Sequence, residues 1–67
     1  MVTIGDNIRT YRKKKQFTQK ELGELIGISN TYLSDMEIGR TNPSIKTLKK
    51  IAKGLDIHYM ELLRDTE

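Results

Sequence analysis

Apolar residues recur along the chain at intervals of three and four, the spacing that places side chains on one face of an α-helix. The first such stripe consists of Ile4, Ile8 and Tyr11. No stretch alternates apolar and polar residues as a half-buried strand would. The pattern therefore predicts an all-α chain whose first helix carries this stripe and ends in a basic run.

A second helix is predicted to begin at Thr18. Thr18 and Glu21 have the three-residue spacing of a capping box. Phe17 and Leu22 occupy the two positions of a hydrophobic staple, which fixes the angle at which the chain enters the helix. Gly27 is expected to end the helix with a positive φ. The buried face is predicted to consist of Leu22, Leu25 and Ile26.

Three further helices follow. Ser29 is expected to cap the third, which Gly39 ends and which turns Leu33 and Met36 inward. After a turn at Asn42-Pro43, Ser44 caps the fourth helix. One side of it carries Ile45, Leu48, Ile51, Ala52 and Leu55, and the other carries Lys46, Lys49, Lys50 and Lys53. A turn at Asp56 leads to a short fifth helix from about His58 to Arg64, with Leu62 facing inward.

The length of 67 residues allows one small domain, predicted over 1–67, because so short a chain buries only about 60% of its unfolded surface. The absence of cysteine excludes a disulfide scaffold and thiolate metal sites. No apolar run approaches the roughly 20 residues that cross a bilayer, and the first twenty residues are too charged for a signal peptide. The expected compartment is the cytoplasm.

The charges are unevenly distributed. Lysine and arginine number 12 against 9 acidic residues; the cations gather in the first twenty residues, whereas residues 54–67 are mostly acidic. This polarity is typical of a domain that approaches a polyanion from one side. The alternative for Lys13 to Lys15 is a solvated helix end, where cations favour the helix dipole.

The two helices predicted over 18–27 and 29–38 carry the main functional signal. A turn this short prevents an antiparallel arrangement, so the helices must cross at a large angle, as in a helix-turn-helix. The second helix can then enter the roughly 12 Å wide major groove of DNA. Its predicted outward residues are short and polar, which suits contact with base edges. They are Asn30, Thr31, Ser34 and Asp35.

Residues along these two helices and the segments that follow them also resemble a known family. The matching positions are Thr18 to Leu22, Gly27 to Ser29, Tyr32 to Ser34, Met36, Glu37, Gly39, Asn42 to Ser44, Leu48, Ile51 and Ala52. In order and spacing they resemble the XRE or Cro/C1-type helix-turn-helix family, which includes lambdoid phage repressors and SinR-like regulators. The resemblance covers nearly the whole chain. It implies a compact five-helix lambda-repressor-like domain with a recognition helix at about Ser29 to Glu37.

The resemblance also implies roles for individual residues. The base-facing positions correspond to Asn30, Thr31, Ser34 and Asp35. Gln19 matches a glutamine that bridges a phosphate and the recognition helix. The other positions implied to contact the DNA backbone are Ser29, Tyr32, Arg40, Thr41 and Asn42. Arg12 and Glu37 match a buried ion pair that links the first and third helices, so both are assigned to the scaffold.

Four positions depart from the family pattern. Ile38 takes a place after the recognition helix that is usually polar. Gly23 replaces the usual Ala between helices two and three, which is expected to cost about 1 kcal/mol of helix propensity. Gln16 replaces a Gly that commonly ends the first helix, so a positive φ there would bring mild strain. Asp35 brings a carboxylate close to DNA, which should make binding more dependent on sequence.

An enzyme is not expected. His58 is the only histidine and stands where a cap is expected, and no nucleophile has a base at a suitable spacing. The paired acids Glu21 and Glu24 share one helix face, but we interpret them as a cap and a solvated surface residue. The sequence suggests no metal site, no cofactor and no small-molecule substrate.

The resulting hypothesis is a sequence-specific DNA-binding regulator of a prokaryote or phage. It would repress as a homodimer on a palindromic operator, paired through Tyr59, Met60 and Leu63. The alternative is an antitoxin-like or regulatory interaction module, for which Ile38 and the same three residues would form an apolar contact surface. A third possibility is the DNA-binding part of a longer regulator.

Overall fold

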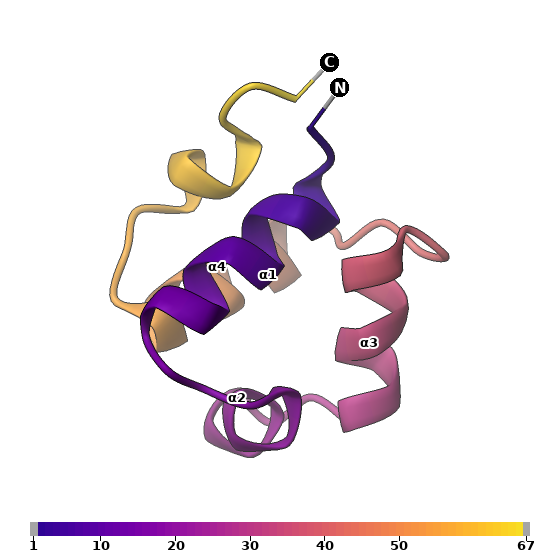
Figure 1. Ribbon diagram of the computed structural model, residues 1–67, viewed down its shortest axis with the longest axis vertical. Coiled ribbons are helices and arrows are strands. Elements are labelled where there is room, and N and C mark those ends of the chain that lie inside the picture. The colour runs from indigo at the N-terminus through magenta and orange to yellow at the C-terminus, as the bar shows by residue number, and fades with distance from the viewer. Residues whose placement is uncertain (1, 67) are drawn as a thin grey trace.

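The computed structural model describes residues 2–66, which contain four α-helices and one short 3-10 helix (Figure 1). These are α1 (Ile4–Lys14), α2 (Gln19–Ile26), α3 (Asn30–Ile38), α4 (Ile45–Leu55) and η1 (Tyr59–Leu63). The predicted all-α helix-turn-helix fold is confirmed. Met1 and Glu67, the ends of the domain predicted over 1–67, lie outside the described residues.

The predicted fifth helix is a 3-10 helix. The Glu61 N–H donates to the carbonyl of His58, three residues earlier, at 2.9 Å, which is the bonding pattern of a 3-10 helix. His58 caps η1, because its Nδ1 accepts from the Met60 N–H at 3.1 Å. The cap predicted at His58 is therefore present.

A hydroxyl side chain caps the start of every α-helix. The predicted caps Thr18, Ser29 and Ser44 are confirmed, and Thr3 caps α1 in the same way. Thr18 forms the predicted capping box with Glu21. In α1, the Thr3 backbone N–H donates to the Asp6 carboxylate, and this bond together with the Thr3 hydroxyl holds the pKa of Asp6 below its ordinary value.

Three helices, α2, α3 and α4, end at residues with positive φ, and a residue with positive φ also follows the last turn of α1. Gly27 and Gly39 have φ of 74° and 86° and end α2 and α3 as predicted. Gln16 has φ of 63°, and the loop closes as the Phe17 N–H donates to the Arg12 carbonyl. The strain expected at Gln16 is therefore present. Asp56 ends α4 with φ of 57°.

One aliphatic core joins all five elements. The buried apolar residues are Ile8, Leu22, Ile26, Leu33, Met36, Leu48, Ile51, Ala52, Leu55 and Leu62. Two predicted core residues are wrong, because Leu25 is 58% exposed and Ile45 is 52% exposed. Gly23 faces the start of α3, and this rotation of α2 turns Leu25 outward. Ile45 is the first residue of α4 and lies at the edge of the core.

The position of α2 depends on close backbone contact with the turn that follows it. A Cβ at Gly23 would lie 2.5 Å from the Ile28 carbonyl oxygen, so even the alanine usual in the family would require a shift here. On its other side α2 packs against α4, while α1 packs against α3, α4 and η1 (Figure 1). The side chain of Asn7 on α1 donates to the carbonyls of Leu62 and Arg64 and so holds the C-terminal segment.

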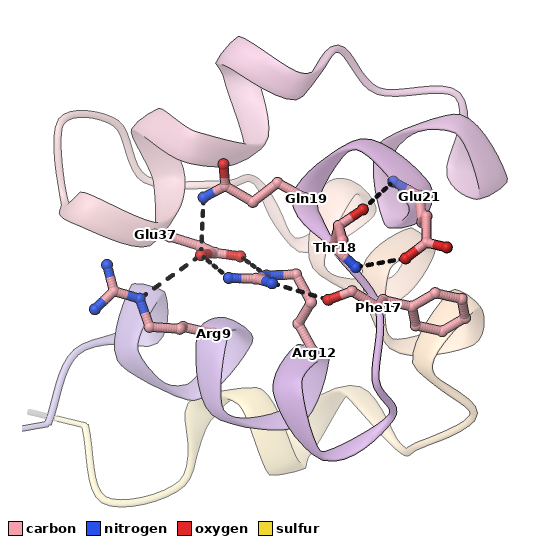
Figure 2. Close-up of polar contacts among 7 residues, drawn as sticks. All are labelled: Arg9, Arg12, Phe17, Thr18, Gln19, Glu21 and Glu37. Atoms are coloured by element: carbon pink, nitrogen blue, oxygen red, sulfur yellow. Dashed lines mark hydrogen bonds and ion pairs between the residues drawn. The ribbon is translucent and has the colours of Figure 1, made fainter.

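A buried ion pair fixes α3 against the rest of the domain (Figure 2). The Glu37 side chain is fully buried, and Arg12 contacts both of its oxygens, at 2.6 and 3.0 Å. Arg12 also donates to the Phe17 carbonyl at 2.9 Å, and Gln19 donates to Glu37 at 3.1 Å. Arg9 approaches the same carboxylate at 3.8 Å. One carboxylate thus joins α1, the α1–α2 loop, α2 and α3.

Replacing Glu37 should therefore impair folding. We expect Glu37→Ala to lower the free energy of unfolding by about 3 to 5 kcal/mol, because it leaves the Arg12 charge buried without its partner. Urea unfolding followed by circular dichroism measures this loss. Glu24→Ala, which removes an exposed carboxylate, is the matched control and should change stability by less than about 0.5 kcal/mol. An unchanged unfolding midpoint for Glu37→Ala would contradict the role of the pair.

The left-handed conformation of Gln16 gives a second prediction. Gln16→Gly should raise the free energy of unfolding by about 0.5 kcal/mol, because removing the Cβ relieves more strain than the freer unfolded chain costs. Lys15→Gly is the control. Lys15 has a negative φ, so a glycine there should destabilise by about 0.5 to 1 kcal/mol. Thermal unfolding of the two variants should shift in opposite directions, and shifts in the same direction would refute the strain at Gln16.

Candidate nucleic-acid interface

The outer side of α3 presents the four residues that the sequence assigned to base contact. Leu33, Met36 and Glu37 occupy the buried side of α3. At 100° per residue, the four polar residues share one arc of about 140°. The arc begins at Asn30, beside Glu37, and extends away from Leu33 and Met36. Asn30 and Thr31 are exposed, whereas Ser34 and Asp35 are half-buried. The most accessible polar groups therefore lie at the N-terminal end of α3.

Gln19 connects the start of α2 to the core of the domain. Its side-chain nitrogen donates to the Glu37 carboxylate at 3.1 Å, and the residue is half-buried. A carboxamide nitrogen carries two protons, so a second donor remains for another acceptor. The bond to Glu37 fixes the orientation of the amide.

A hollow of about 440 Å³ lies beside Gln19, at the N-terminal end of α2. Its lining residues come from α1, the α1–α2 loop, α2 and α3: Arg12, Phe17, Thr18, Gln19, Lys20 and Asn30. Backbone N–H groups at a helix start carry partial positive charge, and Lys20 adds a full one. The hollow therefore has the charge and donor groups that suit an oxyanion. The sequence analysis missed Lys20, although its place directly after Gln19 at a helix start was visible.

The remaining residues assigned to the DNA backbone flank α3. The Ser29 hydroxyl accepts from the Tyr32 N–H at 3.0 Å, so it serves at least as a cap, and Tyr32 is 37% exposed. Beyond α3, Arg40 and Asn42 are exposed and Thr41 is half-buried. The Arg40 N–H donates to the Asp35 carbonyl, so this loop begins close against the end of α3.

The residues expected to pair two copies do not form a uniformly exposed patch. Tyr59 and Leu63 are partly buried and pack against the core. Met60 is 53% exposed, and Ile38, at the end of α3, is 54% exposed. Met60 is therefore the most accessible of the three residues predicted for pairing.

Two further searches of the structure concern metals and membranes. Within residues 2–66, no group of three or more His, Cys, Asp or Glu side chains is placed to hold a metal ion. None of the helices in this same range has the length and apolar character needed to cross a bilayer.

Comparison with known proteins gives consistent matches. Residues 8–62 match the helix-turn-helix family. The chain is 38% identical over 64 residues to the HTH-type transcriptional regulator y4dJ of Sinorhizobium fredii, covering 96% of this chain and 83% of y4dJ. It is 41% identical over 62 residues to the immunity repressor protein of Bacillus phage phi105, covering 92% of this chain and 43% of the repressor.

The fold is similar to that of solved regulators. SinR, a master regulator for biofilm formation whose crystal structure is in complex with DNA, has a TM-score of 0.86 and 42% identity, covering 91% of this chain and 98% of the SinR chain. The chain spans between 43% and 59% of the length of the phage repressor and of the full SinR relatives. Because the family match covers most of this chain, the chain belongs to the XRE-type helix-turn-helix family of DNA-binding transcriptional regulators.

Proposed function

We propose that this protein binds double-stranded DNA sequence-specifically, with α3 in the major groove, and represses transcription as a homodimer. The observation that carries the proposal is the arrangement around Glu37. The buried carboxylate holds the recognition helix and Gln19 together, so a base-reading surface and a phosphate-binding hollow are fixed relative to each other. The SinR crystal structure in complex with DNA, at 42% identity, supports the proposal.

Base recognition is assigned to the outer side of α3. Asn30 and Thr31 are the most exposed of the four candidates, and Asn30 also lines the hollow beside Gln19. An asparagine can pair bidentately with adenine, and threonine can contact a thymine methyl group. Ser34 and Asp35 would reach bases from further along the helix, with Asp35 accepting from a cytosine amino group.

Phosphate contacts are assigned to both ends of the helix-turn-helix. At the first end, Gln19, Lys20 and the N-terminus of α2 would hold one phosphate in the hollow. At the other, Arg40, Thr41 and Asn42 follow α3 and would contact the backbone on the far side of the groove. Ser29 and Tyr32, at the start of α3, would contact the backbone between these two positions.

Pairing of two copies would complete the operator complex. The domain measures 29 × 23 × 21 Å, so two copies lying side by side fit recognition helices one helical turn, about 34 Å, apart. We assign the contact to η1, with Met60 as its exposed apolar residue and Tyr59 and Leu63 beside it. A twofold dimer requires a roughly palindromic operator. Repression, carried out in the cytoplasm, is favoured by the likeness to the phi105 immunity repressor.

Two single substitutions separate base contacts from backbone contacts. Asn30→Ala should weaken binding by about 1 to 3 kcal/mol and relax the preference at one base position, because it removes a base-edge contact. Arg40→Ala should weaken binding to all sequences alike and reduce the slope of log affinity against log salt by about one. Fluorescence anisotropy on duplexes with single-base changes, at several salt concentrations, measures both effects.

Lys46→Ala is the matched control for Arg40→Ala, since Lys46 is exposed on α4 outside the assigned contacts. If Asn30→Ala and Arg40→Ala change affinity equally across all duplexes, the division of roles is wrong. If wild-type affinity is independent of salt, the assigned phosphate contacts are refuted, because phosphate contacts release counterions.

A further inference from the structure

Leu25 is the most exposed large apolar residue of α2. The other apolar residues of the helix, Leu22 and Ile26, are buried, whereas Leu25 is 58% exposed. Its exposure follows from the rotation of α2 that points Gly23 at the start of α3. The proposed DNA-binding surface does not use Leu25.

Leu25 borders a hollow of about 540 Å³ between α2 and α4, lined by Leu25, Ile26, Lys50, Lys53 and Gly54. Gly54 allows α2 and α4 to approach closely while leaving the hollow unfilled. A Cβ at this position would overlap the Ile26 Cγ2 and lie 3.7 Å from a Leu25 methyl carbon. The hollow thus has an apolar wall and a base without a side chain. A branched aliphatic side chain from another molecule fits this surface chemically.

The charges around the hollow are positive. Lys50 and Lys53 are both exposed and line it from α4. The carboxylate that precedes Leu25 by one turn belongs to Glu21, and it is held at the start of α2 by the Thr18 backbone N–H at 2.8 Å. An occupant with carboxylates flanking an aliphatic side chain would therefore be complementary in both charge and polarity.

The hollow lies on the opposite side of α2 from the recognition helix. α2 contacts α3 through Gly23, and it contacts α4 through the edge that carries Leu22, Leu25 and Ile26. The hollow therefore stays accessible when α3 and the start of α2 are occupied by DNA. This position suits contact with a second protein on the same DNA.

We propose that the α2–α4 hollow is a docking site for an acidic segment of another protein that inserts an aliphatic side chain against Leu25 and pairs its carboxylates with Lys50 and Lys53. This goes beyond the DNA-binding function and does not depend on it. It gives the domain two separate surfaces, one for nucleic acid and one for protein.

Nuclear magnetic resonance titration of the whole labelled chain tests the proposal. The probe is the blocked peptide acetyl-Asp-Glu-Leu-Leu-Asp-Glu-amide, added up to about 1 mM. We expect saturable shifts concentrated at the backbone amides of 25–26 and 50–54. Leu25→Ser should weaken binding at least about tenfold, because a buried leucine contributes more than one decade of affinity. Lys50→Gln combined with Lys53→Gln should also weaken it.

Matched controls separate the hollow from general attraction to a basic protein. Ile45→Ser removes an equally exposed aliphatic residue outside the hollow, and Lys46→Gln removes a neighbouring charge; both should leave peptide binding unchanged. A second peptide with serine in place of both leucines should bind at least about tenfold more weakly.

Several results would overturn the proposal. They are the absence of shifts at the highest peptide concentration, shifts spread over all lysines, shifts centred on α3 and the start of α2, and equal binding of the serine peptide. Shifts at 25–26 and 50–54 on concentrating the protein alone would assign the hollow to a second copy, which would also refute a foreign partner. If DNA displaces the peptide from residues 50–54, the hollow would be assigned to nucleic acid instead.

Discussion

The arrangement of the helix-turn-helix depends on one buried carboxylate. Glu37 lies on the inward side of α3 and receives Arg12 from α1 and Gln19 from α2 (Figure 2). A buried charge is tolerated only when it is paired and hydrogen-bonded, so the three helices must meet in the geometry that satisfies it. Glu37 therefore fixes the direction in which α3 projects as well as its distance from α2.

This constraint accounts for the character of the recognition helix. α3 buries only two apolar side chains, Leu33 and Met36, beside Glu37. The ion pair fixes the orientation of α3 where apolar contacts alone would not. The outer side of the helix can therefore carry short polar residues such as Asn30 and Thr31, which are poor helix formers but suit base edges. The charge of Arg12 is paired with Glu37 inside the domain, whereas nearby cations such as Lys20 are exposed.

Local signals in the sequence predicted most of the fold. Thr18, Ser29 and Ser44 were predictable as caps because a hydroxyl directly before a helical run can accept from the free N–H groups of the first turn. Ile45 was misassigned because it is the first residue of α4 and lies at the edge of the core. Leu25 was misassigned because helical spacing identifies an apolar stripe but not the rotation of α2 against its neighbours. That rotation is set by Gly23 against the Ile28 carbonyl, a contact between two elements that periodicity does not show.

The candidate site was predictable in part. The positions on α3 followed from the helical pattern, whereas the partnership of Arg12 with Glu37 came from the family resemblance, since residues 25 apart carry no local signal of contact. Arg9 at the same carboxylate was missed, although it lies one turn before Arg12. The half-burial of Ser34 and Asp35 depends on packing around α3 that the sequence does not show.

In the proposed complex, α3, held by Glu37, reads DNA as one half of a twofold pair. Selection of bound duplexes from a random pool at near-physiological salt is the sharpest test of this arrangement. We expect an enriched pseudo-palindrome whose half-sites have centres about 10 base pairs apart. Recovery of duplexes with no shared sequence would contradict it.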